Sequence, residues 1–233
     1  MKLFSLILLI IVIIISVVIY SGWNKNKLLL SGFKSGTEAT TIAASKLPSN
    51  KSSNNYAYSL WFYVKNWQYK LQDSKCLLRR GTLEGHNPEI SFTPYENNIN
   101  VTINMYPQSQ GQEGETQTCT IRNFPLQKWC NLIVSLNGRA LDMYLDGKLV
   151  RTCILPAVAK VYSDSDVLVT PEGGFSGWTS NVQYWSHPLN PQEAYNIYKG
   201  GYGSGGLGGL FEKYKIRVSY LVDNSEKGSF NIL

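Results

Sequence analysis

The stretch from Lys128 to Val150 limits the fold more strongly than any other part of the sequence, because apolar residues recur at every second position in two segments and it contains two tight-turn pairs. Apolar and polar residues largely alternate in two segments, as expected for half-buried β-strands. The apolar positions are Leu132, Val134 and Leu136 in the first segment and Leu141, Met143 and Leu145 in the second. Asn137-Gly138 and Asp146-Gly147 supply the positive φ angles that tight hairpins need. The pattern predicts three consecutive strands of an antiparallel meander.

Other alternating segments indicate that this meander belongs to a larger sandwich. Tyr56–Lys65 carries aromatic residues on both faces, so we expect a central strand there. Further strands are expected at Cys76–Arg80, Glu89–Thr93, Asn98–Met105 and Trp178–Trp185, and an exposed loop at Gln108–Gln117.

A single short helix is predicted after Asn190. Asn190 is a favourable N-cap, Pro191 suits the first helical position and Glu193 completes a capping box, while Gly200 suits the C-cap. The Gly-rich residues 201–209 lack the ending of a phosphate-binding loop and are expected to be a connector. Alternation in the last residues predicts a C-terminal hairpin.

The meander and the helix together resemble the laminin-G-like, concanavalin-A-like jelly rolls. The resemblance is carried by the Leu141–Val150 segment after a strand opened by a Trp, and by Gly173–Trp178 followed by Gln183–Ala194. The positions that we assign to this signature are Trp129, Tyr144, Asp146, Gly147, Gly177, Trp178 and Trp185. The resemblance implies an all-β, antiparallel jelly-roll β-sandwich, a fold that binds ligands and is sometimes an enzyme.

The N-terminal segment from Leu3 to Tyr20 contains no charged side chain. At about 1.5 Å per residue it reaches roughly 27 Å, enough for a thin bilayer. We therefore predict an N-terminal transmembrane helix, with the anchor positions Leu3, Phe4, Ile10, Val18, Tyr20 and Trp23. A cleaved signal peptide is the alternative, but residues 19–23 match its small-x-small site poorly.

The predicted domain organisation has four parts. Residues 1–22 form the transmembrane anchor, 23–36 a juxtamembrane stalk and leading strand, 37–200 the jelly-roll β-sandwich, and 201–233 the Gly-rich connector and C-terminal β-hairpin. Lysines at 25, 27 and 34 follow the apolar segment, and this charge bias favours a body on the cytosolic side.

The orientation decides how the cysteines are interpreted. The chain contains Cys76, Cys119, Cys130 and Cys153. In a cytosolic body these would be reduced thiols, and Cys130 and Cys153 are expected to pack as small apolar residues on strands. A disulfide is the alternative if the body is exported, and the glycosylation sequons at Asn50 and Asn100 matter only in that case.

Charge gives little support for a nucleic-acid partner. Only 16% of the residues are charged, and the net charge of +6 is spread along the chain. The densest basic spot is the pair Arg79-Arg80, whereas a nucleic-acid-binding face shows a basic stripe with aromatic residues between. We expect no nucleic-acid partner.

The residues for catalysis are also sparse. Glucan hydrolases need two carboxylates at a defined separation, and no strand segment here alternates acids in that way. Asp142 and Asp146 fit a strand edge and a turn, and His86 and His187 lie beside prolines. We therefore expect neither an enzyme nor a cofactor.

Two sets of residues are candidates for binding a ligand. Asp164 and Asp166 are weak calcium candidates, because Ca²⁺ prefers six to eight oxygen ligands. Trp67 and Tyr69 are candidates for stacking on a sugar, although most aromatic residues in such a sandwich are needed for the core.

The segments Phe124–Trp129, Arg151–Pro156 and Gly173–Trp185 also resemble a group of membrane-anchored proteins of large icosahedral DNA viruses. This resemblance implies a minor capsid-associated virion protein that tethers the internal membrane to the capsid shell. Its partners would be the lipid bilayer and other capsid or virion proteins, and its body would lie on the cytosolic or capsid-facing side. The alternative is a membrane-anchored, carbohydrate-binding lectin-like module, for which the cysteines would be oxidised and glycan would be the partner.

Overall fold

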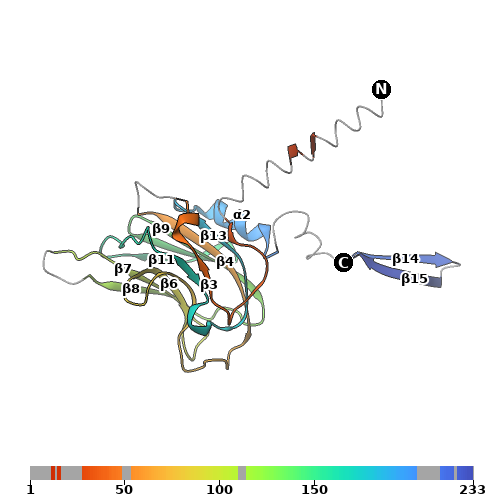
Figure 1. The fold of residues 1–233 in the computed structure, drawn as a ribbon, viewed down its shortest axis with the longest axis horizontal. Coiled ribbons are helices and arrows are strands. Elements are labelled where there is room, and N and C mark those ends of the chain that lie inside the picture. Colours follow the sequence, from red (N-terminus) through yellow and green to blue (C-terminus); the bar gives the residue numbers. More distant parts are fainter. Residues whose placement is uncertain are drawn as a thin grey trace.

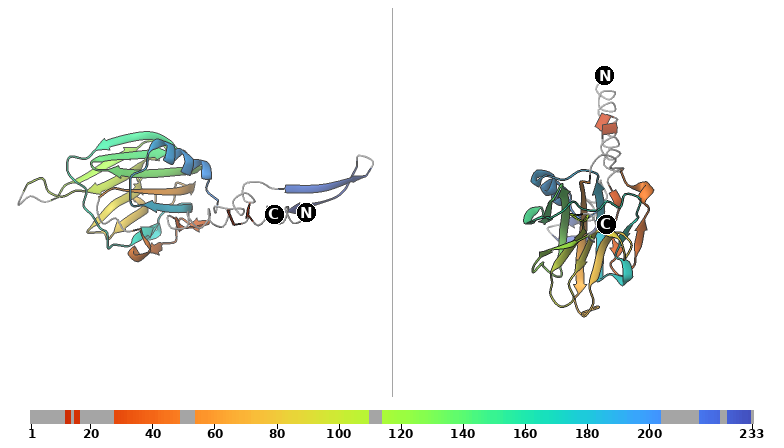
Figure 2. Two further views of the ribbon diagram at one scale, coloured as in Figure 1. Left: turned by 90° about the horizontal axis from the view of Figure 1, so that it is seen from above. Right: turned by 90° about the vertical axis from the view of Figure 1, so that its left-hand side faces the viewer.

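The protein is a sandwich of two antiparallel β-sheets, seen here in a computed structural model (Figure 1). The structure describes residues 12–13, 15–16, 28–48, 54–109, 114–203, 216–222 and 225–232. Figure 2 shows the two sheets as layers, with helix α2 lying on the outer side of one of them. The predicted fold class, an all-β antiparallel jelly-roll sandwich with one short C-terminal helix, is confirmed.

The larger sheet has seven strands. In chain order they are β1 (Leu28–Leu30), β2 (Lys34–Ser35), β4 (Tyr56–Asn66), β9 (Trp129–Asn137), β10 (Ala140–Leu145), β11 (Lys148–Ile154) and β13 (Ser176–Trp185). Their order across the sheet is β1-β13-β4-β9-β10-β11, and β2 pairs with β13. The predicted meander is therefore confirmed as β9, β10 and β11.

The smaller sheet has six strands. In chain order they are β3 (Thr40–Ile42), β5 (Lys75–Gly81), β6 (His86–Phe92), β7 (Ile99–Asn104), β8 (Thr116–Ile121) and β12 (Val167–Val169). Their order is β3-β12-β5-β6-β7-β8. Short 3-10 turns, η1 (Ala44–Lys46) and η2 (Pro171–Gly173), lie in the connections.

Strand β4 is central and buried on both faces, as its aromatic pattern predicts. Tyr58, Leu60 and Phe62 point into the core between the sheets and are inaccessible to solvent. Ala57 and Trp61, on the opposite face, are also buried. A strand covered on both sides loses the usual polar face, which explains why Ser59 is the only hydrophilic side chain between Ala57 and Val64.

The second turn of the meander uses the predicted pair, since Asp146 and Gly147 have φ angles of 50° and 74°. The first turn lies one position later than predicted: Asn137 ends β9 and pairs with Ala140, so the turn residues are Gly138, with a φ angle of 60°, and Arg139. Gly177 is required for a different reason: a side chain there would collide with the carbonyl oxygen of Tyr63 on the neighbouring strand. The signature glycines thus serve a tight turn and a close approach between strands.

Helix α2 (Pro191–Gly200) covers part of the outer face of the larger sheet (Figure 2). It begins with the predicted capping box, in which Asn190 and Glu193 exchange hydrogen bonds of 2.9 Å. The small outer cluster under it consists of Ala57, Ile133, Tyr144, Trp185, Leu189 and Ala194. Gly200 is the last helical residue, and the C-cap is Gly201, one position later than predicted.

Three parts of the sandwich differ from or extend the predicted elements. Strand β8 lies partly in the segment expected to be an exposed loop, because only Cys119 and Ile121 of its residues face the core. Strand β12, of three residues, is not among the predicted strands. Leu28–Leu30 and Lys34–Ser35, from the predicted stalk region, pair with β13 at the edge of the larger sheet.

Only parts of the two ends of the chain are described. Residues 12–13 and 15–16 are helical, and among the described residues no helix has the length and apolar character needed to cross a bilayer. Leu3, Phe4, Ile10, Val18, Tyr20, Trp23 and Asn50 lie outside the described residues. At the other end, β14 (Ile216–Val222) and β15 (Ser225–Ile232) pair as the predicted C-terminal hairpin, in a sheet of their own.

The capping box gives a first testable prediction. We expect Asn190→Ala to lower the free energy of unfolding by about 1 kcal/mol, because the backbone N–H of Glu193 loses its acceptor. Urea unfolding followed by tryptophan fluorescence measures this. Gln192→Ala is the matched control, since its side chain bonds only to Asn196 on the exposed face of the helix; equal losses in both variants would contradict the role of the cap.

Candidate functional site

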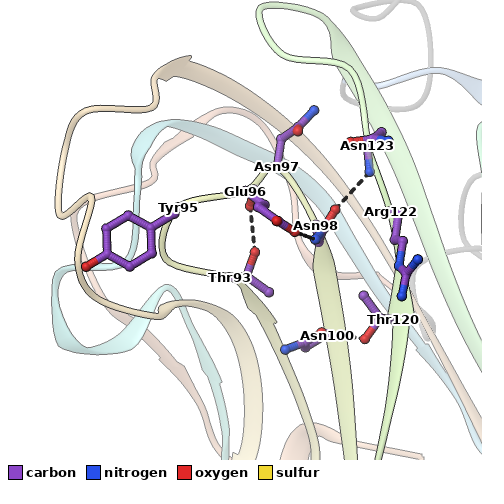
Figure 3. A pocket seen from close by; sticks show the side chains of 9 residues that line it. All are labelled: Thr93, Tyr95, Glu96, Asn97, Asn98, Asn100, Thr120, Arg122 and Asn123. Carbon is purple, nitrogen blue, oxygen red and sulfur yellow. Dashed lines mark hydrogen bonds between the residues drawn. The ribbon is translucent and has the colours of Figure 1, made fainter.

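A polar pocket of about 850 Å³ opens where the β6–β7 turn meets β8 (Figure 3). Its lining residues are Thr93, Tyr95, Glu96, Asn97, Asn98, Asn100, Thr120, Arg122 and Asn123. The turn between β6 and β7 supplies the first five, and β7, β8 and the residues after β8 supply the rest. All of these side chains except the Tyr95 ring are polar, so the pocket is suited to a ligand rich in hydroxyl groups.

Hydrogen bonds within the turn fix the shape of the pocket. Thr93 Oγ1 donates to the carbonyl oxygen of Glu96 at 2.6 Å, and Asn98 Nδ2 donates to Glu96 Oε2 at 2.6 Å. Asn98 Oδ1 in turn accepts from the backbone N–H of Asn123 at 3.0 Å, which joins the turn to the end of β8 (Figure 3). Asn98 is buried, so this geometry is held before any ligand arrives.

Three groups remain available to a ligand. The Tyr95 side chain is 67% exposed at the edge of the pocket. Arg122 is exposed, and its guanidinium has no hydrogen-bond or ion-pair partner among the described residues. Asn100 Oδ1 accepts from Thr120 Oγ1 at 2.8 Å, whereas its Nδ2 points away from Thr120 (Figure 3). An aromatic ring, an amide donor and a guanidinium therefore border one opening.

The position of Asn100 links this pocket to the predicted glycosylation site. Its side chain is half-buried on the outer face of β7, in the sequon that ends at Thr102. A glycan attached there would occupy the pocket. Glycosylation at Asn100 therefore stays a prediction that competes with ligand binding at the same place.

The two aromatic residues predicted to stack on a sugar lie elsewhere and are engaged in the fold. The Trp67 ring packs against Phe92 and Phe124, and its Nε1 donates to the carbonyl oxygen of Tyr95 at 3.2 Å. Tyr69 donates its hydroxyl to the carbonyl oxygen of Gly173 at 3.0 Å. Both residues are half-buried, and neither lines the polar pocket.

A second group of aromatic rings lies on the outer face of the larger sheet, beside α2. The chain after α2 turns back over β13, where Ser180 donates to the carbonyl oxygen of Tyr202, and the Tyr202 ring stacks on Trp129 at 4.9 Å. Tyr63 contacts both Trp129 and Trp178, and Trp178 remains 39% exposed. Two of the signature tryptophans thus cover the outside of the sheet instead of filling the core.

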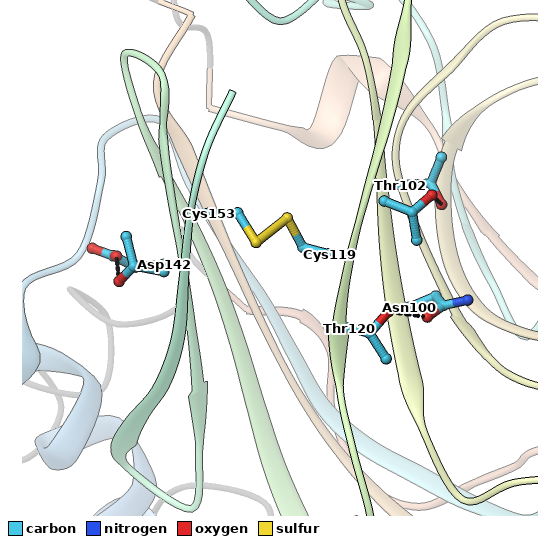
Figure 4. Close-up of a disulfide and its surroundings, with 8 residues drawn as sticks. Asn100, Thr102, Cys119, Thr120, Asp142 and Cys153 are labelled. Carbon is cyan, nitrogen blue, oxygen red and sulfur yellow. Dashed lines mark hydrogen bonds between the residues drawn. A yellow bond between two sulfur atoms is a disulfide. The ribbon is translucent and has the colours of Figure 1, made fainter. Parts of the chain in front are cut away.

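The smaller sheet is joined to the larger one by a disulfide between Cys119 and Cys153 (Figure 4). Cys119 is on β8 and Cys153 on β11, so the bond connects the edge strands of the two sheets. The expectation of a free thiol at Cys153 was wrong, because the pairing of edges from different sheets leaves no trace in the local alternation. Thr120, next to Cys119, faces the opposite side and lines the pocket, so the disulfide holds a pocket strand in place.

The other two cysteines are free and buried, as predicted for Cys130. Burial is the main cause that raises the pKa of both thiols, Cys76 and Cys130, to about 12. At neutral pH these thiols are protonated and poorly nucleophilic.

The acidic residues singled out in the sequence do not come together. Asp142 accepts from Thr152 Oγ1 at 2.6 Å, while Asp146 binds Lys128 at 3.0 Å and the backbone N–H of Asn131 at 2.9 Å. Within the described residues there is no group of three or more side chains placed to hold a metal ion.

The calcium candidates Asp164 and Asp166 lie in the exposed connection before β12. Asp166 Oδ1 accepts from the backbone N–H of Ala44 at 2.9 Å, and Asp164 accepts from the hydroxyl of its neighbour Ser163 at 3.3 Å. Both carboxylates therefore have roles within the chain.

Residues 35–194 match the family model Laminin_G_3, described as the concanavalin A-like lectin/glucanases superfamily. The chain belongs to this superfamily. The predicted laminin-G-like resemblance is thereby confirmed, whereas the resemblance to viral membrane-anchored proteins stays a prediction. No curated protein shows significant sequence similarity to the chain.

Solved structures of botulinum neurotoxin binding domains share the superfamily fold. The ligand binding domain of serotype D, in complex with N-acetylneuraminic acid, superposes with a TM-score of 0.55 at 13% identity, over 77% of this chain and 45% of that one. The receptor binding domain of neurotoxin D gives 0.53 at 13% identity, over 75% and 43%. A structure of botulinum neurotoxin type C, whose cell entry is dependent upon interaction with two ganglioside molecules, is also similar. It superposes with a TM-score of 0.52 at 13% identity, over 69% of this chain and 39% of that one. The chain spans less than half the length of these proteins, and the likeness shows the fold alone.

The polar pocket was not predicted from the sequence, where residues 94–97 only lie between the expected strands Glu89–Thr93 and Asn98–Met105. The signal was present as four asparagines and a glutamate within residues 96–100 and 123. Its meaning depends on β8, a strand that the alternation failed to reveal. Only the pairing of β7 with β8 brings Asn100 and Thr120 together.

The cysteine assignment gives a second testable prediction. A thiol reagent at pH 8 should detect essentially no thiol in the native protein, because a pKa of about 12 leaves about one thiolate in ten thousand. It should detect two thiols after unfolding without reductant and four after reduction. Four thiols in the unfolded, non-reduced chain would contradict the disulfide.

Proposed function

We propose that this protein is a carbohydrate-binding, lectin-like module and that the polar pocket is its glycan site. The observation that carries the proposal is the combination of the exposed Tyr95 ring with amide, hydroxyl and guanidinium groups around one opening. Sugars present apolar C–H faces and several hydroxyl groups, so an aromatic ring and convergent polar groups match both parts. The side chains stand on paired strands and a hydrogen-bonded turn, which lowers the entropy lost on binding.

The disulfide supports this function over a cytosolic role. Disulfides persist mainly in exported or lumenal proteins, where most glycans are displayed. Oxidised Cys119 and Cys153 are what the lectin alternative requires and what a reducing cytosol disfavours. We therefore propose a body on the oxidising side of its membrane, opposite to the side favoured by the charge bias.

The expected chemistry is binding without turnover. Asp142 and Asp146 are both occupied by partners within the fold, and the pocket itself contains one carboxylate, Glu96, which accepts from Asn98. A glycosidase of the usual kind needs a second carboxylate across the bound sugar. The arrangement favours recognition of a terminal sugar.

A glycan array with the full-length chain in neutral detergent tests the proposal. We expect wild type to bind a restricted set of glycans, and Tyr95→Ala and Arg122→Gln each to weaken binding by about tenfold or more, since each removes a contact worth roughly 1.4 kcal/mol. N-acetylneuraminic acid and its neutral counterpart N-acetylglucosamine are included as soluble competitors.

Tyr106→Ala is the matched control for this experiment. Tyr106 is 46% exposed but lies outside the pocket, so its loss should leave glycan binding unchanged. Mass spectrometry of Asn100 shows whether an attached glycan fills the site. An absence of array binding by the unglycosylated chain, or equal binding by Tyr95→Ala and Tyr106→Ala, would overturn the proposal.

A second candidate is the tethering role in a virion, with lipid and capsid proteins as partners. It is favoured by β11, an edge strand of the larger sheet whose Leu149, Val150 and Ile154 side chains are exposed. An apolar edge with unpaired backbone groups can take up a strand from another protein. Joined to the predicted anchor over residues 1–22, this edge would hold a neighbouring protein close to the bilayer.

Membrane flotation tests the tethering candidate. We expect the full chain to float with lipid vesicles and a chain without residues 1–22 to remain in the soluble fraction, because the apolar segment provides most of the membrane affinity. Ile154→Lys should lower incorporation into assembled particles, with Lys148→Gln on the same strand as the control. A truncated chain that still floats would refute the predicted anchor.

A further inference from the structure

A second pocket, of about 720 Å³, opens at the end of the sandwich where β4 begins and β5 ends. Its floor is formed by Arg80, Tyr56, Tyr184 and Asn87, all of them buried. Lys160 and Asp164 lie at its rim, in the connection between β11 and β12. Polar groups thus replace aliphatic side chains at this end of the space between the sheets.

Arg80 is 8% exposed and has only neutral partners. Its Nη2 donates to the carbonyl oxygen of Ser163 at 2.7 Å, and its Nε to that of Ser165 at 3.3 Å. Its Nη1 donates to the hydroxyls of Tyr58 and Tyr184 at 3.4 and 3.3 Å. No carboxylate in the described part of the chain forms an ion pair with it.

The neighbouring residue shows the contrast. Arg79 is similarly buried, at 4% exposed, but it pairs with Glu89 at 2.7 Å and with Glu172 at 2.6 Å. The same backbone segment therefore carries one buried guanidinium with two counter-charges and one with none. A buried charge without a counter-charge is costly, so the end of the sandwich that holds Arg80 attracts an anion.

The hydroxyl of Tyr184 extends this attraction into the pocket, which Tyr184 lines and Tyr58 does not. Both tyrosines accept hydrogen bonds from Arg80, so each hydroxyl hydrogen is left to donate, and no described residue accepts it. Burial is the main cause that raises the pKa of Tyr58, so this hydroxyl keeps its proton.

We propose that this pocket binds a small ligand through an oxyanion, a carboxylate or a sulfate group, that supplies the missing counter-charge. Tyr184 donates its hydroxyl hydrogen to the oxyanion, Arg80 polarises that hydroxyl from below, and Lys160 adds a second positive charge at the rim. Asp164 opposes the ligand, which leaves a net charge of one positive unit on these groups. The site is separate from the polar pocket, with which it shares no lining residue.

The test is isothermal titration of the full-length chain in neutral detergent with sodium acetate, sodium sulfate and N-acetylneuraminic acid, each at matched ionic strength with sodium chloride. We expect saturable binding of at least one of these probes. Acetate and N-acetylneuraminic acid without sulfate would identify a carboxylate site, and sulfate alone a sulfate-ester site. No saturable binding of any probe would overturn the proposal.

Variants at the rim make the test specific. Tyr184→Phe and Lys160→Gln should each weaken binding by about tenfold, the effect of one charge-assisted hydrogen bond or close charge, and Asp164→Asn should strengthen it about twofold. Lys148→Gln, on an exposed strand outside the pocket, should leave binding of all three probes unchanged. Tyr95→Ala, in the polar pocket, should leave binding of acetate and sulfate unchanged. Asp164 is exposed and Lys160 is half-buried, so both variants can be measured even if Tyr184→Phe fails to fold. Equal affinities in both rim variants and wild type would overturn the site.

Discussion

Burial of β4 on both of its faces is the constraint on which the rest of the molecule depends. Tyr58, Leu60 and Phe62 fill the space between the sheets, and Trp61 and Ala57 are covered from outside. Because the inner face is fully used for packing, no ligand can enter the middle of the sandwich. Binding is therefore confined to the outer surfaces, the edges and the ends, which is where both pockets lie.

The two pockets differ in how their polar groups are paired within the fold. In the β6–β7 turn, the buried Asn98 forms hydrogen bonds with Glu96 and with the backbone of Asn123, while Tyr95 and Arg122 remain at the surface. At the end of the sandwich, Arg80 and tyrosine hydroxyls line the pocket, and no carboxylate of the described residues forms an ion pair with Arg80. The first arrangement suits a neutral, hydroxyl-rich ligand, and the second suits an anion.

The disulfide between β8 and β11 adds a covalent link where neither sheet continues. Edge strands are the least constrained parts of a sheet, since one side of each has no partner. Joining the two edges keeps β8 in register with β7, and so keeps Asn100 beside Thr120 in the polar pocket. It also leaves the outer side of β11 exposed, with its apolar side chains facing solvent.

The sequence by itself determined the elements whose signals are local. The meander, the central aromatic strand and the capping box followed from alternation, turn residues and spacing, because each depends on neighbours within a few positions. The superfamily was expected from the resemblance of segments such as Leu141–Val150 to its members. Tertiary structure decided the features that join distant positions. These are strand β8, the Cys119–Cys153 bond, the packing and hydrogen bonds that engage Trp67 and Tyr69 within the fold, and the ion pairs that Arg79 forms and Arg80 lacks. These depend on which strands become neighbours across and between sheets, and that pairing is set by the packing of the whole core, which no short segment specifies.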